Sequence, residues 1–304
     1  MLRLMAQELP FAGKLDRSCA RVKIAIQGEC GSFSHQAALQ FDRDATIVPC
    51  ALSRDVFERV VRGEVEAIAI PIENTLAGAV VEHYDLLREQ PVHIVRETVV
   101  RIQHHVIGVP GSKLSDIRRV YSHPVALAQC REFFREHAEI EARSFYDTAG
   151  AVKQVLEGQE RDAAGIAGMQ AATIYGGEVL VPSVEDDAAN YTRFLLVRAG
   201  ARTTTVEGAQ KVSVCLEVAH QIGAMALVLG AVNELEGNVT NLQPRPAHGR
   251  PWEYHFFLDV LLPHAAAAQR LLERLPALTT MHKVLGCFPV APEFLSAAAG
   301  LRES

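Results

Sequence analysis

The amino-acid sequence predicts a mixed α/β protein built from two parts of different topology. From residue 21 onward, short apolar segments alternate with amphipathic ones, as in strands and helices packed in layers. A polar, threonine-rich stretch at 199–210 interrupts this rhythm, and the segments after it follow the order βαββαβ. One apolar strand, 93–109, is too long for a single sheet. We therefore expect an N-terminal part whose two lobes are joined by that strand, and a smaller C-terminal domain.

The N-terminal part alternates strands and helices along both lobes. The strands of the first lobe are expected at 21–27, 46–50 and 66–71, with helices at 34–42 and 53–63, the second capped by Ser53. In the second lobe we expect strands at 118–123, 141–146 and 163–168, and helices at 124–137, 147–158 and 171–180, the last stopped by Gly176 and Gly177. The segment 191–199 then returns to the first lobe.

The C-terminal domain has the ferredoxin-like order of elements. Its strands are expected at 211–219, 238–244, 252–262 and 282–290, and its helices at 224–237 and 265–275.

Composition excludes several classes of protein. The net charge is −6 and the basic residues are scattered, which argues against a nucleic-acid partner. The six cysteines lie far apart with no C-x-x-C pair, which is typical of a reduced intracellular protein without a zinc site. The first twenty residues lack the apolar core of a signal peptide, and no apolar run is long enough to span a membrane. We expect a cytoplasmic protein without a membrane partner.

Two turns in the first lobe carry polar groups where ligands commonly bind. The turn 27–34 joins a strand to a helix whose free N–H groups could hold an anion, although a purely structural Gly-x-x-Gly turn is equally consistent. The segment 71–78 follows a strand directly, at the sheet edge where α/β proteins place ligands. The alternative there is a strand end followed by a helix cap.

Histidine and threonine positions in the second lobe allow two interpretations as well. His123 precedes Pro124 at a helix start, so it is either a cap or a substrate contact. Thr148 holds the same position in the next unit. His104 and His105 are adjacent in a strand, so they point to opposite faces and at most one faces a cleft. No further ligand at usable spacing supports a metal.

The strand 191–199 begins with polar residues. Alternation places Thr192 and Phe194 on one face and Arg193 on the other. Considered alone, this is an edge strand with a surface arginine; following a lobe-crossing chain, it delivers Thr192 to the cleft between the lobes.

Five segments resemble those of prephenate dehydratases, in the same order along the chain: 27–38, 67–80, 122–130, 164–176 and 184–197. Two later segments resemble the ACT domain that is attached to these enzymes: 223–246 and 252–260. The resemblance covers 22–292 and implies a two-lobed catalytic domain similar to bilobal solute-binding proteins, then a ferredoxin-like ACT domain. It implies the domains 1–21 (N-terminal extension), 22–199 (catalytic, with lobe one at 22–99 and 190–199 and lobe two at 100–189), 200–210 (linker), 211–292 (ACT) and 293–304 (tail). No helical chorismate mutase segment precedes residue 22, so the monofunctional form is expected.

The reaction implied by the resemblance is the decarboxylating dehydration of prephenate to phenylpyruvate, a step toward L-phenylalanine, with no cofactor or metal. Thr192 is then the catalytic residue, a hydrogen-bond donor to the leaving hydroxyl. The implied substrate-binding residues are Ser32, Glu73, Asn74, Thr75, His123, Thr148, Arg193 and Phe194. Two alternatives remain: arogenate as the substrate, or a non-catalytic protein that senses an amino acid.

The resemblance also implies an effector site for L-phenylalanine in the ACT domain, and a homodimer or homotetramer. Its residues are Gly223, Ala224, Met225, Asn238, Gln243, Arg245 and Pro246. Where the family has Glu-Ser-Arg-Pro, this chain has Gln-Pro-Arg-Pro at 243–246, which removes a carboxylate and a hydroxyl. The alternative is an ACT domain that serves dimerisation alone.

Overall fold

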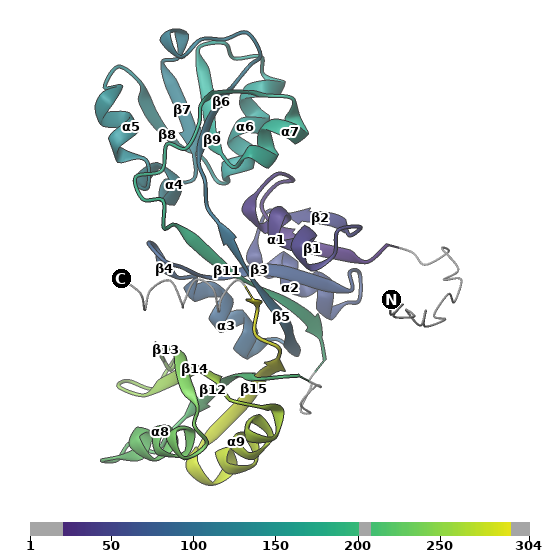
Figure 1. Cartoon of the computed structure of the whole chain (residues 1–304), viewed down its shortest axis with the longest axis vertical. Coiled ribbons are helices and arrows are strands. Elements are labelled where there is room, and N and C mark those ends of the chain that lie inside the picture. The colour runs from purple at the N-terminus through teal and green to yellow at the C-terminus, as the bar shows by residue number, and fades with distance from the viewer. Residues whose placement is uncertain (1–20, 201–207, 293–304) are drawn as a thin grey trace, which may run out of the picture.

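The computed structural model describes residues 21–200 and 208–292. The expected tail, the extension up to residue 20 and residues 201–207 of the linker lie outside the described residues. Figure 1 shows three bodies along the long axis: lobe two at one end, lobe one in the middle and the C-terminal domain at the other end. No helix in the described parts is long and apolar enough to cross a membrane.

Lobe one is a sheet with helices on both faces. In the sheet, β1 pairs in parallel with β2 and β3, and β11 pairs antiparallel with both β3 and β5. Alternate residues of these strands pack against α1 on one face and against α2 and α3 on the other, so the buried segment 67–70 of β3 is apolar at every position. The elements are β1 (Lys23–Gln27), α1 (Phe33–Phe41), β2 (Thr46–Cys50), α2 (Ser53–Val61), β3 (Ala67–Asn74), β4 (Gly78–Ala79), α3 (Val81–Glu89), β5 (Val92–Arg101) and β11 (Tyr191–Ala199).

Ser53 does not cap α2 as expected. The N-cap is Leu52, which makes no side-chain cap hydrogen bond, and Ser53 is the first helical residue. The Ser53 hydroxyl donates instead to Glu82 at 2.9 Å. The Ser53 hydroxyl therefore binds a residue of α3 instead of capping its own helix.

Lobe two is a separate five-stranded sheet in the order β10-β6-β9-β7-β8. The expected long strand 93–109 is two strands, β5 and β6, interrupted at 102–104 where the chain passes between the lobes. The expected helix 171–180 ends at Tyr175, because Gly176 takes a φ of 71°, and the chain continues as a strand. The elements are β6 (His105–Gly108), η1 (Leu114–Asp116), β7 (Arg119–Ser122), α4 (Pro124–Ala128), α5 (Arg131–Glu136), β8 (Glu141–Ser144), α6 (Thr148–Glu157), β9 (Ala163–Ala167), α7 (Met169–Tyr175) and β10 (Glu178–Val181).

The expected helix 124–137 is also divided, into α4 and α5. The carboxylate of Asp186, on the second lobe-crossing segment, accepts from the backbone N–H groups of Arg131 and Glu132 at 3.0 and 2.9 Å. It thus caps the start of α5 from outside the helix. The break turns Gln129, between the two helices, toward the space between the lobes.

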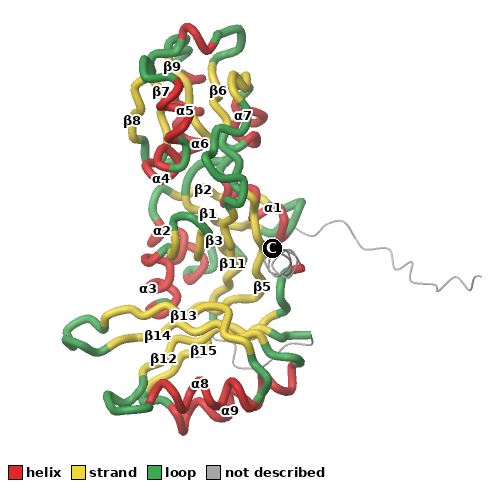
Figure 2. Tube along the Cα trace, turned by 60° about the vertical axis from the view of Figure 1, so that its left-hand side comes forward, coloured by secondary structure: helices red, strands yellow, loops and turns green. Residues whose placement is uncertain are grey.

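The C-terminal domain has the predicted βαββαβ order, and its strands lie in the order β13-β14-β12-β15. Figure 2 shows α8 and α9 together on the outer face of this sheet. The inner face packs on lobe one, where Phe257 and Tyr84 of α3 have ring centroids 5.0 Å apart. The elements are β12 (Lys211–Glu217), α8 (Ala224–Glu234), β13 (Asn238–Pro246), β14 (Tyr254–Leu261), α9 (Ala265–Leu278) and β15 (Met281–Phe288).

The sheets of lobe one and of the C-terminal domain are continuous. β15 pairs in parallel with β5 at Gly286 and Ile94. A Cβ atom on Gly286 would lie 2.6 Å from the Ile94 carbonyl oxygen, so only glycine allows this approach. The two domains therefore form one ten-stranded sheet.

Candidate active site

A cleft of about 450 Å³ lies between the two lobes. Lobe one contributes the carboxyl ends of β1 and β3, the start of β11 and the turn before α1, and lobe two contributes the starts of α4 and α6. The predicted site residues that line it are Ser32, Asn74, His123, Thr148, Thr192 and Phe194. Glu73, Thr75 and Arg193 are not among the lining residues.

Thr192 is held by Asn74 across the β11–β3 pair. The Asn74 side-chain oxygen accepts from the backbone N–H groups of Leu76 and Ala77 at 3.0 and 2.7 Å, so the amide nitrogen must point the other way. That nitrogen donates to the Thr192 hydroxyl oxygen at 2.9 Å. Because the hydroxyl accepts this bond, its own proton is available for a group in the cleft.

The same logic extends through a chain of polar groups that the sequence did not reveal. Asn74 also donates to the Asn190 oxygen at 2.8 Å, and Asn190 donates to the Gln129 oxygen at 2.9 Å. His104 Nε2 lies 3.1 Å from the Gln129 oxygen, which can only accept, so the ring donates from Nε2. Asn190 is fully buried just before β11. A buried amide needs hydrogen-bond partners, and those of Asn190 are the other members of this network.

His104 therefore carries a proton on Nε2. Burial is the main cause that lowers its pKa. Its Nδ1 atom is buried and has no hydrogen-bond partner among the described residues. His105 does not line the cleft but a separate groove, together with residues of α1 and α7. The two histidines thus lie on different faces, as their adjacency predicts.

The cleft holds no cationic side chain among its described lining residues, although Glu82 and Asp147 both line it. Helix starts supply positive potential instead. The Ser32 hydroxyl caps α1, and the Asp147 carboxylate caps α6 by accepting from Gly150 at 2.8 Å. His123 caps the short helix α4 through Nδ1. Each of these three caps lies at the cleft.

Glu29 connects the two lobes. Its carboxylate accepts from the Tyr146 hydroxyl at 2.9 Å and from Lys153 Nζ at 3.1 Å. Tyr175 of lobe two adds a bond from its hydroxyl to the Cys30 carbonyl oxygen at 2.8 Å. Burial, together with Glu29, raises the pKa of Tyr146 to about 12, so its hydroxyl stays protonated as a donor.

The predicted substrate contact of Arg193 does not fit this geometry. The side chain is 6% exposed and points away from the cleft, because alternation along β11 puts it opposite Thr192 and Phe194. Its guanidinium pairs with Glu97 and Asp259 at 2.8 and 2.6 Å. Glu73 lies on the same side, 3.8 Å from Arg193.

Thr75 has a local structural role. Its hydroxyl donates to the Ala189 carbonyl oxygen at 2.9 Å and accepts from the backbone N–H of Tyr191 at 3.0 Å. It ties the turn after β3 to the start of β11, one residue away from each partner of the Asn74–Thr192 pair.

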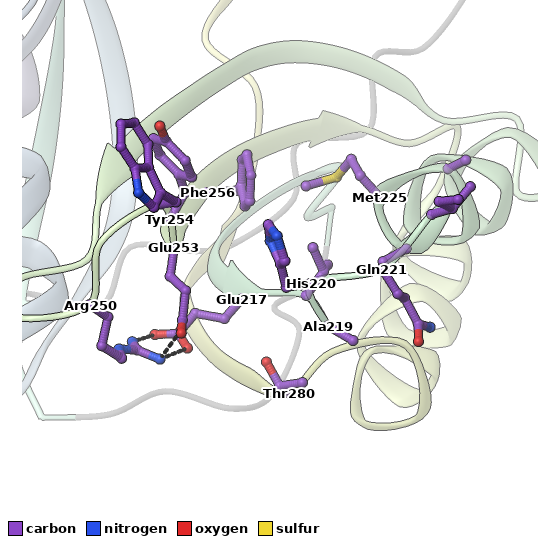
Figure 3. Close-up of a pocket in the computed structure, with 16 residues that line it drawn as sticks. Glu217, Ala219, His220, Gln221, Met225, Arg250, Glu253, Tyr254, Phe256 and Thr280 are labelled. Carbon is purple, nitrogen blue, oxygen red and sulfur yellow. Dashed lines mark hydrogen bonds and ion pairs between the residues drawn. The ribbon is translucent and has the colours of Figure 1, made fainter.

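The C-terminal domain carries a groove of about 960 Å³, shown in Figure 3. The predicted effector residues Gly223, Ala224 and Met225 line it at the start of α8. Arg250 closes one end by pairing with Glu217 and Glu253, as the dashed lines in Figure 3 mark. Arg245 and Pro246 line a different groove beside α3, and Asn238 and Gln243 line neither of these two.

Comparison with known sequences places the chain in one family. A family model described as prephenate dehydratase matches residues 24–202. An arogenate dehydratase/prephenate dehydratase of Arabidopsis thaliana chloroplasts is 33% identical over 284 residues, which are 89% of this chain and 74% of that protein. The bifunctional chorismate mutase/prephenate dehydratase of Escherichia coli K12 is 31% identical over 272 residues, 88% of this chain and 70% of that protein.

Solved structures agree. Prephenate dehydratase of Arthrobacter aurescens in complex with L-Phe has a TM-score of 0.79 and 29% identity, covering 93% of this chain and 99% of that one. GqqA, described as a novel type of quorum quenching acylase, has a TM-score of 0.81 and 32% identity over 90% and 99% of the two chains. The chain therefore belongs to the prephenate dehydratase family, whose reaction is the dehydration of prephenate in phenylalanine biosynthesis.

Proposed function

We propose that the inter-lobe cleft binds prephenate and that Thr192 is its catalytic hydroxyl. In the reaction the bond from the ring to its carboxylate breaks and releases carbon dioxide. The electron pair moves through the ring, which becomes aromatic, and the opposite C–O bond breaks to release hydroxide, which takes up a proton to become water. The enzyme has to orient the ring and stabilise the charge that develops on the leaving oxygen.

The observation that carries this proposal is the orientation of the Thr192 hydroxyl. It accepts from Asn74, whose own orientation is fixed by two backbone N–H groups. Its proton can therefore donate to the leaving oxygen without Thr192 having to ionise, which a threonine does poorly. Phe194, two residues on and on the same face, forms a wall for the ring.

The carboxylates of the substrate would be held by helix starts and neutral donors. The start of α1 lines the cleft with Ser32, and Thr148 adds a neutral hydroxyl from lobe two, where the Asp147 carboxylate already caps the start of α6. This arrangement is compatible with a dianion although no lysine or arginine of the described chain lines the cleft. Glu73, Thr75 and Arg193 do not touch the substrate. They support the strand ends that carry Asn74 and Thr192.

The test compares Thr192→Val with Thr192→Ser on prephenate and on arogenate, following phenylpyruvate and phenylalanine. We expect the valine variant to lose turnover and the serine variant, which keeps the hydroxyl, to retain most of it. Preferential turnover of arogenate by the unmodified chain would make the enzyme an arogenate dehydratase. Binding of either substrate without turnover would favour the non-catalytic sensor and would refute the enzymatic role of Thr192.

We infer further that the C-terminal domain is an ACT domain whose groove at the start of α8 takes L-phenylalanine. Free N–H groups at a helix start suit its carboxylate, and Met225 and Phe256 offer apolar surface to its ring. Added phenylalanine should lower prephenate turnover, and Met225→Trp, which fills the groove, should remove that response. Unchanged turnover in the presence of phenylalanine would restrict the domain to assembly.

Two expectations stay predictions. Ile222 and Trp252 are almost fully exposed at the groove edges, which supports a second copy covering this face in a homodimer or homotetramer. Sedimentation analysis would give the number of chains. The cytoplasmic location inferred from the sequence is the other.

A further inference from the structure

A buried cluster of charges joins the catalytic strands to the C-terminal domain. We call it the junction network: Arg193 of β11, Glu97 of β5, Lys211 of β12 and Asp259 of β14. Glu97 receives Arg193 at 2.8 Å and Lys211 at 2.9 Å, and Asp259 receives Arg193 at 2.6 Å. The side chains are between 0% and 7% exposed.

The two domains contribute equally to the charge of the junction network. Lobe one supplies one cation and one anion, and the C-terminal domain supplies the same. Desolvation opposes the ionisation of Asp259, yet Arg193 and Lys211 hold its pKa below the usual value. A buried charge without its partner is strongly unfavourable, so the position of each member is fixed by the others.

The network lies directly behind the catalytic pair. Along β11 and β3, Thr192 pairs with Asn74 and Arg193 pairs with Glu73; the register then shifts, so that Phe194 pairs with Pro71. Such a bulge re-aims the side chains beside it. Arg193 is adjacent to Thr192 and its guanidinium is 3.8 Å from Glu73, the neighbour of Asn74. Arg193 therefore contacts the end of β3 and belongs to the start of β11, next to the point where the bulge interrupts the pairing of these two strands.

We propose that Arg193 is a positioning residue that orients the Thr192–Asn74 pair. The C-terminal domain holds Arg193 in place directly through Asp259, and indirectly through Lys211, which pairs with Glu97. This inference rests on the proposed catalytic role of Thr192. It makes the C-terminal domain part of the catalytic geometry, in addition to any effector that it binds. A salt bridge with only a stabilising role would leave the orientation of Thr192 unchanged.

A second ion pair across the same domain boundary provides a matched control. Arg245 of β13 pairs with Asp85 of α3 at 2.7 Å, with side chains 25% and 35% exposed. Like Asp259, Asp85 is a carboxylate that holds an arginine across the boundary. Unlike Asp259, it pairs with a residue that is not on β11.

The experiment compares Asp259→Asn with Asp85→Asn in the full chain. In Asp259→Asn we expect kcat on prephenate to fall about tenfold or more while KM changes less than about threefold, as misplacement of a reacting group predicts. Asp85→Asn should leave both constants unchanged. Ser213→Ala is a milder change, since the Ser213 hydroxyl bonds Asp259, and should give a smaller fall in kcat if Asp259→Asn does not fold.

A second readout does not depend on turnover. In protein labelled at threonine methyl groups, the Thr192 signal is identified by its loss in Thr192→Ser. It should shift in Asp259→Asn and in Ser213→Ala, and stay in place in Asp85→Asn. A shift without any turnover by the unmodified chain would refute the proposed function and leave the positioning role standing. An unmoved Thr192 signal in Asp259→Asn, or equal effects of Asp259→Asn and Asp85→Asn on kcat, would overturn the inference.

Discussion

The chain has two internal junctions, and they are built in opposite ways. The lobes meet across an open cleft, and the contacts that bridge it, such as the Glu29–Lys153 pair with side chains 23% and 35% exposed, are partly solvated. Lobe one and the C-terminal domain instead share a continuous sheet and the buried junction network. Solvated polar contacts are weak and easily exchanged for water, whereas buried charges are not. We therefore expect the first junction to open for substrate and the second to hold β5 and β11 in place.

The strongest test of this contrast is Glu97→Gln in the junction network. It removes the buried carboxylate that pairs with both Arg193 and Lys211, so we expect the free energy of unfolding to fall by about 3–5 kcal/mol. Denaturant titration followed by circular dichroism measures it. Glu58→Gln, which breaks the exposed pair with Arg62, is the control and should cost at most about 1 kcal/mol. Similar losses in both variants would abolish the distinction between the buried charges and exposed ones.

Thr192→Val tests the cleft side of the same contrast. Loss of a donor to developing negative charge should raise the activation barrier by about 2.7–4 kcal/mol, which is a fall in kcat of about 100- to 1,000-fold. The fold should remain intact, because valine has the shape of threonine and the neighbouring Phe194 belongs to an apolar core cluster. Steady-state kinetics beside a thermal melt measure both. A large loss of stability with unchanged kcat would place Thr192 in the packing instead of the chemistry.

The two junctions should also respond to acid at different pH. Burial lowers the pKa of His104, so its stabilising contribution is complete above the unfolded value of about 6.5 and is lost as the pH falls through the folded value. The pKa of Asp259 is depressed below 3.8, so its contribution persists until much lower pH. The lobe junction should therefore weaken first.

Unfolding free energies between pH 7 and pH 5 measure this effect, with a slope of up to about 1.4 kcal/mol per pH unit for one histidine. His104→Gln, which cannot titrate, should reduce the slope. An unchanged slope in that variant would assign the acid sensitivity to other buried histidines, such as His83.

The smallest effect is expected for Glu29→Gln at the lobe junction. Its ion pair is partly exposed, so the free energy of unfolding should change by at most about 1 kcal/mol. The variant should change KM for prephenate more than kcat, because it loosens the lobes without moving Thr192. A fall in kcat with KM unchanged would mean that Glu29 acts on the chemistry.

The sequence predicted what depends on local periodicity. Alternation from residue 191 assigned Thr192 and Arg193 to opposite faces, and the order of elements identified the C-terminal domain. It could not supply the partners of polar groups, because these come from distant segments. Asp259, which holds Arg193, belongs to another domain, and Asp186, which starts α5, lies on the returning crossing segment.

Gln129 shows the same limit inside the cleft. In the sequence it occupies an ordinary position within an apparently continuous helix. Only the break between α4 and α5 turns it toward Asn190 and His104. Pattern and resemblance therefore lead to Thr192 as the proposed catalytic residue, whereas they do not reveal the hydrogen-bond chain that extends from it.

The approach of Gly286 to Ile94 has a consequence for biosynthesis. During translation β5 and β11 emerge long before β15, so until the end of the chain is made β5 is an uncovered edge strand whose Glu97 lacks Lys211. Such edges promote aggregation. A chain that terminates soon after residue 200 is therefore expected to be removed or to aggregate instead of working as an unregulated enzyme, and completion of the last strand is what releases a usable catalyst.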